Sequence, residues 1–266
     1  MLGISKKAKG VNVTNQEYHK AEGISSSDFR LLEESCLHLL HKKLFTLESK
    51  SLDLGSALHK YVLEVQEFDK EFCVEPEFNK RTNQGKEAYE NWLALNFDKT
   101  ILSESDMQKV SLMGDNILAL AGGLLKQGVA EKSIFAKDTN GVIRKCRPDY
   151  YREDLGLVID IKTSKDGSDF AFSKNLFEYN YFLQAAWYLD TMMLAGHQAK
   201  RFLFIIVDTS SPYMVRIREI SPEAIELGRE KYLALLQEYR HFLNTKECEV
   251  IKTIDLPSWV YTNKSA

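Results

Sequence analysis

An apolar stretch at residues 157–162 carries two charged side chains, Asp160 and Lys162. Side chains alternate between the two faces of a β-strand, so this acid and this lysine share one face. Asp149 lies upstream, and a turn centred on residues 154–155 makes it the direct cross-strand partner of Asp160. Directly paired side chains are about 4.5–5.5 Å apart. We therefore expect two carboxylates and a lysine to meet at one point of a sheet.

Two carboxylates at that separation repel each other unless a cation lies between them. Oxygen ligands of this kind suit Mg²⁺ or Mn²⁺, so Asp149 and Asp160 predict a metal site. Lys162 beside such a metal could orient an attacking water or stabilise charge on a phosphate, which is typical of phosphodiester hydrolysis. The alternative is an Asp–Lys surface pair on an edge strand, and the strand pattern alone favours neither.

Two further pairs of polar residues lie one helical turn apart. Gly55 and His59 share a face of the helix expected at residues 51–65, where the glycine would let a neighbour approach the imidazole. Gln184 and Tyr188 are also four residues apart, and an amide with a phenol could hold the lysine or a DNA phosphate. The alternatives are a core histidine for the first pair and ordinary helix packing for the second.

Three segments are candidates for contact with DNA. Their residues are Ser25 and Ser27, then Lys80, Arg81 and Lys86, and finally Arg144 and Arg147. The serines begin a predicted helix and could hold a 5′ terminal phosphate, although plain N-capping explains them equally well. The middle set belongs to a polar loop able to reach phosphate oxygens, or is simply a solvated charge run. The last set, with Lys145, would put positive charge beside the strand that carries the predicted metal site.

Hydrophobic periodicity indicates the elements that position these residues. Helices are predicted from near 25–27, over about 51–65, from 86 in two patterns to about 123, over about 170–195 and over 222–243. Strands are predicted over 134–136, 142–151, 157–163, 202–207 and 214–220, and a loop over 68–85. This order favours a mixed sheet flanked by helices. We expect a loosely attached N-terminal arm at residues 1–20 and a single domain over 21–266.

The composition is that of a globular chain, with 266 residues of which 44% are hydrophobic and 27% charged. A net charge of -3 excludes a protein that coats nucleic acid by bulk charge, but leaves local basic patches open. No apolar run approaches the roughly 18–20 residues of a membrane span, and the start lacks a signal-peptide pattern. We expect a cytoplasmic protein with no membrane partner. The four cysteines form no C-x-x-C pair, which favours free buried thiols.

Three of these motifs together resemble a known superfamily. Pro148-Asp149, followed after ten residues by Asp160-Ile161-Lys162, is similar to the PD-(D/E)xK signature of restriction-endonuclease-like enzymes. Residues 55–59 match the GxxxH element of RecB-type members, and residues 184–188 match their QxxxY element. Stretches within 52–59, 76–83, 146–149 and 251–259 resemble the nuclease-domain family of exonuclease VIII, the RecE family, over about residues 18–260.

The resemblance implies a restriction-endonuclease-like mixed β-sheet core flanked by helices. The implied activity is metal-dependent degradation of the 5′-ended strand of linear double-stranded DNA, with Mg²⁺ or Mn²⁺ as cofactor. It assigns metal coordination to Asp149 and Asp160 and the role of catalytic lysine to Lys162. The implied additional metal contacts are His59, the backbone carbonyl of Ile161 and, as a third acid, Glu131. Gln184 and Tyr188 would border the cleft.

The same resemblance implies partners: double-stranded DNA ends, other copies of the chain in a homo-oligomeric ring, and a single-strand annealing protein of (pro)phage-type recombination. Some RecB-type nucleases carry an iron–sulfur cluster on cysteines around the core. Only Cys248 lies near the end of this chain, so we expect no cluster. The alternatives are a RecB-type endonuclease or single-strand exonuclease, a catalytically silent DNA-end-binding module, and a scaffold whose acids bind no metal.

Overall fold

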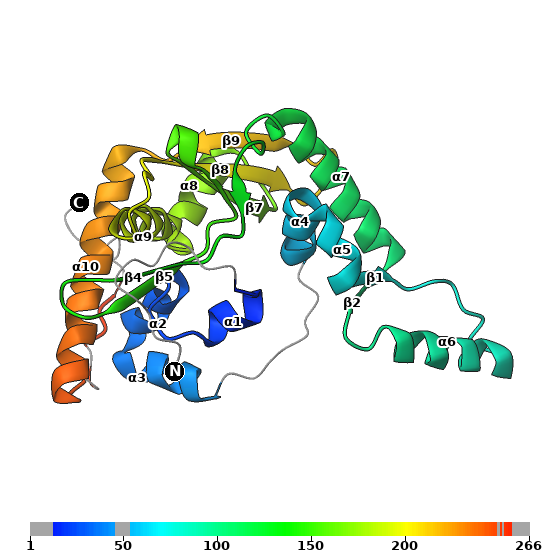
Figure 1. Ribbon diagram of the computed structural model, residues 1–266, viewed down its shortest axis with the longest axis horizontal. Coiled ribbons are helices and arrows are strands. Elements are labelled where there is room, and N and C mark those ends of the chain that lie inside the picture. The colour runs from blue at the N-terminus through cyan, green and yellow to red at the C-terminus, as the bar shows by residue number, and fades with distance from the viewer. Residues whose placement is uncertain (1–12, 46–53, 249–250, 252, 257–266) are drawn as a thin grey trace, which may run out of the picture.

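A mixed five-stranded sheet forms the centre of the computed structural model, which describes residues 13–45, 54–248, 251 and 253–256 (Figure 1). The strands follow the order β3-β6-β7-β8-β9, and only β7 and β8 run parallel. Their bounds are β3 Val129–Ala130, β6 Tyr150–Arg152, β7 Leu157–Ser164, β8 Arg201–Asp208 and β9 Val215–Glu219. The mixed α/β architecture predicted from the sequence is confirmed.

Helices cover both faces of this sheet (Figure 1). On one face lie α2 Phe29–Glu34, α3 Cys36–Phe45, α8 Asp169–Glu178, α9 Tyr181–Leu194 and α10 Pro222–Thr245. On the other face lie α4 Leu54–Leu63 and α7 Glu104–Ala121. Among the described helices, none combines the length and the apolar character needed to cross a membrane.

Alternation along β7 divides the hydrophobic core in two. Val158 packs into the core beneath α9, whereas Ile159 and Ile161 pack into the core beneath α4 and α7. This is the predicted assignment of the two faces, and it aims Asp160 and Lys162 to the same side as Val158. Because both faces are covered, nearly the whole strand is buried. The acid and the lysine therefore do not form a surface pair on an edge strand.

Three elements that were predicted to be continuous are divided into shorter elements in the structure. The expected strand 142–151 is two strands, β5 Ile143–Cys146 and β6, because Pro148 between them has no N–H to donate to a ladder. β5 pairs instead with β4 Ile134–Lys137 in a separate two-stranded sheet. The expected helix 170–195 is divided into α8 and α9 at Asn180, whose φ of 56° is left-handed. The first helix begins as a 3-10 turn, Ser26–Asp28, before α2.

The predicted loop 68–85 is wrong in part, because it contains the end of α5 Val65–Glu71 and the strand β1 Phe72–Val74. β1 pairs in parallel with β2 Thr100–Leu102, and the chain between them forms an excursion, residues 75–99, that carries α6 Asn83–Leu95. α6 has no buried residue and lies apart from the central sheet (Figure 1).

The N-terminal segment is attached more firmly than expected where the structure describes it. α1 Asn15–Lys20 begins with a capping box between Thr14 and Glu17. The Tyr18 side chain is buried, and the ammonium of Lys145 donates to the carbonyls of Tyr18 at 3.0 Å and Ala21 at 2.8 Å. Residues 1–12, 51–53 and 257–259, which also entered the sequence predictions, lie outside the described residues.

Candidate active site

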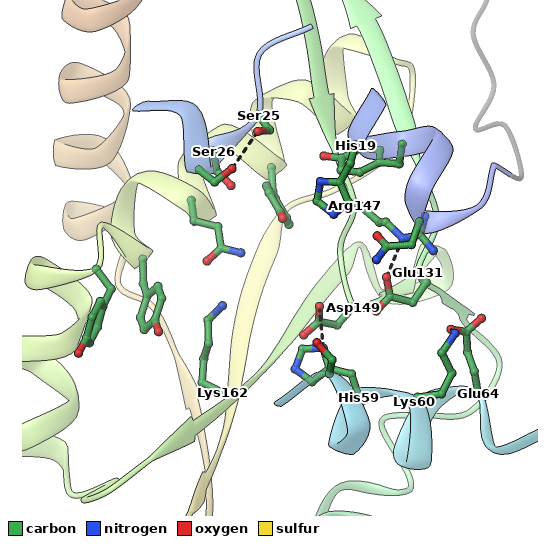
Figure 2. Close-up of a pocket in the computed structure, with 18 of the residues that line it drawn as sticks. His19, Ser25, Ser26, His59, Lys60, Glu64, Glu131, Arg147, Asp149 and Lys162 are labelled. Carbon is green, nitrogen blue, oxygen red and sulfur yellow. Dashed lines mark hydrogen bonds and ion pairs between the residues drawn. The ribbon is translucent and has the colours of Figure 1, made fainter. Parts of the chain in front are cut away.

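A cavity of about 460 Å³ opens where β7 meets α1, α4 and α9 (Figure 2). It brings together residues from distant parts of the chain. Those from the sequence predictions are Ser25, Ser27, His59, Glu131, Arg147, Asp149, Lys162, Gln184 and Tyr188. In Figure 2 the side chains of His59, Asp149 and Glu131 point toward one another, and Lys162 extends from β7 into the same space.

Two buried carboxylates form the centre of the site. The β6–β7 register pairs Tyr150 with Ile159, and its extension by one residue sets Asp149 opposite Asp160, as predicted. Asp149 is 8% exposed and accepts a hydrogen bond from the Ile161 amide at 2.6 Å, while Asp160 is 2% exposed. Burial, reinforced by the charge of Asp160, raises the pKa of Asp149 to about 7. The folded chain therefore resists holding both negative charges without a cation.

His59 reaches the same point from α4. Its Nε2 lies 2.9 Å from the carbonyl oxygen of Ile161, and its Nδ1 lies 3.5 Å from Oδ1 of Asp149. Burial disfavours the charged imidazole, but the neighbouring carboxylates, Asp149 foremost, outweigh it and raise the pKa of His59. The histidine is therefore bound to polar groups of the site rather than enclosed by apolar side chains.

Glu131 completes a set of three possible metal ligands. Its amide donates to the Asp149 carbonyl at 3.0 Å from a left-handed backbone, φ 50°. One ligand atom each from His59, Glu131 and Asp149 lie within 4.8 Å of one another. A divalent cation fits this set, because an imidazole and two carboxylates can bind it while it relieves the repulsion between buried acids. Arg147 holds Glu131 in place through a 2.7 Å bond from Nε to Oε2.

Asp160 is occupied differently from Asp149. The ammonium of Lys162 lies 2.7 Å from Oδ2 of Asp160, and the amide of Gln184 donates to Oδ1 at 2.8 Å. Although burial disfavours the charged lysine, Asp160 and Asp149 raise the pKa of Lys162, so it carries its positive charge. The same ammonium lies 4.5 Å above the ring of Tyr181. This side of the cavity thus holds a cation beside the acids.

Tyr188 lies one turn after Gln184 and also lines the cavity. Its ring packs against Phe202 in the core, and burial together with the charge of Asp160 raises the pKa of its phenol well above the usual range. The hydroxyl therefore stays neutral and can donate a hydrogen bond. Gln184 and Tyr188 border the cavity as expected, and Gln184 contacts an acid directly.

Some of the residues predicted to contact DNA line the cavity, and others do not. Ser25 and Ser27 line the cavity, but the amide and hydroxyl of Ser25 both donate to Asp28 Oδ2 at 2.8 Å. This capping box supports the N-capping interpretation. Arg147 also lines the cavity, where its guanidinium donates to Glu131 and to Ser133 Oγ.

The prediction for Arg144 is wrong. Its side chain is buried, its guanidinium lies 3.4 Å from Asp138 and stacks over the ring of Trp187, and Arg240 joins the same carboxylate. A base held between an acid and an indole in the core cannot reach a phosphate. Lys145 beside it is equally buried, with its ammonium bound to α1.

The three bases of the excursion do not line the cavity. Lys80 is bound to Glu75 at 2.5 Å and lies 3.6 Å above the ring of Tyr89. Arg81 and Lys86 are exposed. Any contact these residues make with DNA is therefore made at a distance from the carboxylates.

Two parts of the cavity wall were not predicted from the sequence. α1 contributes Asn15, Tyr18 and His19, and its capping-box pattern Thr14-x-x-Glu17 was the readable signal of an ordered helix. The opposite rim is an ion-pair bridge, in which the Lys60 ammonium binds Glu64 at 2.7 Å and Glu71 at 2.8 Å. The (i, i+4) spacing of Lys60 and Glu64 was visible, but their place beside the cavity was not.

Comparison with known proteins adds a family and a fold. The family model of a PDDEXK-like domain of unknown function (DUF3799) matches residues 25–256. A search of curated proteins gave no match. The structure is similar to that of a candidate exonuclease from Eubacterium rectale, with a TM-score of 0.58 and 12% identity over 96% of this chain and 99% of that chain. At that identity the likeness shows a shared fold.

A phage-related exonuclease from Haemophilus somnus 129PT aligns over 77% of this chain and 99% of that chain at 16% identity. Its TM-score of 0.29 is too low to support an argument about the fold.

Proposed function

Because the chain belongs to the family of PDDEXK-like domains (DUF3799), whose model it matches over residues 25–256, we propose that it is a metal-dependent deoxyribonuclease. The observation that carries the proposal is the convergence of Asp149, Lys162 and His59 in one cavity, with Asp160 buried directly behind Lys162 and ion-paired with it. Two buried acids that favour a bound cation, beside a fixed ammonium, are groups suited to phosphodiester hydrolysis.

His59, Glu131 and Asp149 would hold a Mg²⁺ or Mn²⁺ ion, with the Ile161 carbonyl, next to His59, as a further oxygen donor. Asp160 would be the second aspartate ligand, as the family resemblance implies. Such an ion, when bound, supplies a Lewis acid and lowers the pKa of a coordinated water. Lys162 would then leave part of its pairing with Asp160 to neutralise charge on the phosphate. Gln184 would keep Asp160 oriented during that exchange, because its amide already holds Oδ1.

The more specific proposal is a 5′ to 3′ exodeoxyribonuclease that degrades the 5′-ended strand of linear double-stranded DNA. It is supported by the resemblance to the RecE nuclease-domain family, with its GxxxH, PD-(D/E)xK and QxxxY elements in order. The same resemblance supports a homo-oligomeric ring and a single-strand annealing partner. Light scattering of the purified protein would test the ring, since a monomer mass of 30.5 kDa in solution would refute it.

The activity test uses linear duplex DNA labelled at the 5′ or the 3′ end, with and without Mg²⁺, beside closed circular DNA. We expect release of the 5′ label as a mononucleotide only with metal, no cutting of circles, and no release by Asp160→Ala. Cutting of circles or of single strands would favour a RecB-type endonuclease or single-strand exonuclease. Binding of ends without release under any metal would favour a silent end-binding module.

A melting experiment tests the metal separately from the chemistry. If the site binds Mg²⁺ in the folded state only, Mg²⁺ must raise the melting temperature of the wild type. The Asp149→Asn variant should lose that increase because it lacks one ligand charge. An equal increase in both proteins would show that the ion binds elsewhere.

A further inference from the structure

The turn between α8 and α9 brings two tyrosines to the mouth of the cavity. Tyr179 and Tyr181 both line it, with ring centroids 5.5 Å apart and an interplanar angle of 32°. The Tyr181 ring is backed by core aromatics, stacking on Phe172 at 6.1 Å. Tyr179, in contrast, remains 51% exposed. The pair therefore extends an aromatic surface from the core outward to solvent.

This turn is fixed in position. Asn180 lies between the tyrosines with a left-handed φ of 56°, which is uncommon for a residue other than glycine. Its side chain is buried, donating to Glu33 of α2 at 3.0 Å and accepting from Lys231 of α10 at 2.9 Å. Glu33 and Lys231 are themselves ion-paired. The aromatic surface is thus held by helices on both sides rather than by a free loop.

The same turn is joined to the acids. The backbone nitrogen of Gln184 donates to the carbonyl oxygen of Asn180 at 2.9 Å, and the side-chain amide of Gln184 donates to Asp160 at 2.8 Å. The Tyr181 ring lies beneath the ammonium of Lys162. A nucleotide whose phosphate lay at Lys162 would therefore have an aromatic face within reach of its base.

The cationic side chains on the cavity wall are already paired with carboxylates. Lys60 binds Glu64 and Glu71, Arg147 binds Glu131, and Lys162 binds Asp160. The wall also offers the face of an aromatic ring. Every nucleobase can stack on such a face, so this interaction does not depend on the DNA sequence. A base inside a duplex is already stacked, so a platform of this kind favours an unpaired one.

We propose that Tyr179 and Tyr181 form a stacking platform for unpaired nucleobases of the strand to be cut, so that the cavity receives a melted strand end rather than an intact base pair. The inference rests on the proposed nuclease function and deepens it by naming the form of the substrate. Tyr179 carries the test, because its ring is exposed, whereas the ring of Tyr181 contacts the ammonium of Lys162.

The test measures stacking without cleavage. Duplex DNA with a flap of three unpaired nucleotides at the 5′ or the 3′ end, one of them 2-aminopurine, is titrated with protein in metal-free buffer. We expect quenching of the fluorescence by the wild type and by Tyr179→Phe, which keeps the ring. Tyr179→Ala should weaken binding of one flapped DNA on the order of tenfold and leave binding of fully paired DNA unchanged.

Phe170→Ala is the matched control. Phe170 is an aromatic residue of α8, the helix that ends just before Tyr179, and it is 74% exposed but does not line the cavity. Its loss should leave quenching unchanged. The proposal is overturned if the wild type quenches neither flap, if Tyr179→Ala binds as the wild type does, or if Phe170→Ala loses as much.

The two proposals can fail independently. Quenching that depends on Tyr179 in a protein that never cuts with Mg²⁺ would refute the nuclease and leave the platform. Metal-dependent cutting with quenching that ignores Tyr179 would refute the platform alone. Far-UV circular dichroism of each variant checks that it is folded. We expect each to fold, because the substituted side chains are exposed.

Discussion

The cavity and the excursion at residues 75–99 differ in how their charged groups are used. In the cavity, the charged side chains around the acids are buried or half-buried and paired with one another: Lys162 with Asp160, and Arg147 with Glu131. On the excursion, α6 has no buried residue, and the bases Arg81 and Lys86 are exposed. Chemistry needs groups fixed in low dielectric, whereas retention of a charged polymer needs only solvated charge.

Substitutions in the two regions should differ in severity. A buried ionised carboxylate lowers the stability of the folded chain when it lies beside another carboxylate. Such a loss of stability is typical of functional sites. An exposed base carries no such cost. Substitutions in the cavity should therefore change the reaction, and substitutions on the excursion should change only the affinity for DNA.

The largest effect is expected for Asp149→Asn. The amide still accepts from the Ile161 nitrogen but cannot supply a negative charge, so cleavage should fall about 10³-fold. Because the pKa of Asp149 is raised to about 7, the metal-free variant should melt higher than the wild type at pH 8. Cleavage rates and thermal melts check this, with Asp154→Asn, an exposed acid paired with Arg152, as control. A variant that is both active and less stable would contradict the comparison.

The next effect is a pH dependence. In the folded state Asp149 keeps its proton up to about pH 7, whereas its ordinary pKa is 3.8, so the metal-free protein should lose stability as pH rises between those values. His59 has a raised pKa and acts in the same direction. Mg²⁺ competes with these protons, so the increase in melting temperature that it causes should grow from pH 6 to pH 8. An increase that shrinks over that range would show that other groups bind the ion.

A smaller loss is expected for Gln184→Ala. Gln184 orients Asp160 and is a positioning residue, so its removal should reduce cleavage by between about tenfold and a hundredfold. Gln184→Glu should be worse, since it sets a negative charge against Asp160. Single-turnover rates measure both. Equal rates for the two variants would mean that the hydrogen bond to Asp160 does not matter.

The smallest effect is expected on the excursion. Arg81→Ala should weaken DNA binding about threefold and reduce the slope of log affinity against log salt by about 1, with no change in the rate of cleavage by bound enzyme. Binding titrations at several salt concentrations check it, with Lys126→Ala, another exposed base, as control. A loss of cleavage as large as that of Asp149→Asn would remove the distinction between the two regions.

What could be predicted from the sequence is what depends on local alternation. The faces of β7 and the opposition of Asp149 and Asp160 follow from period two and from the short turn between strands. The division of α8 from α9 could not be predicted, because both helices are apolar on compatible faces and Asn180 gives only a weak signal of a left-handed turn.

Long-range pairing is the other limit. Arg144 stands in a run of bases that looks like a surface cluster, yet Asp138 and Arg240 enclose it in the core. His59 and the Ile161 carbonyl meet across 102 positions of sequence. Motif order indicated that such residues belong together, but no periodicity encodes which atoms touch.

The parallel pairing of β1 with β2 has a consequence for how this chain can change in length. Val74 pairs with Leu102 and Phe72 with Thr100, so the chain leaves at Val74 and returns at Thr100 on an adjacent strand. Because the two strands run parallel, the connection must also return along their length, so it is a crossover and cannot be a tight turn. Residues 75–99 supply this crossover, and because α6 within them has no buried residue, the segment is open to exchange or extension without disturbance of the strand that bears Asp160.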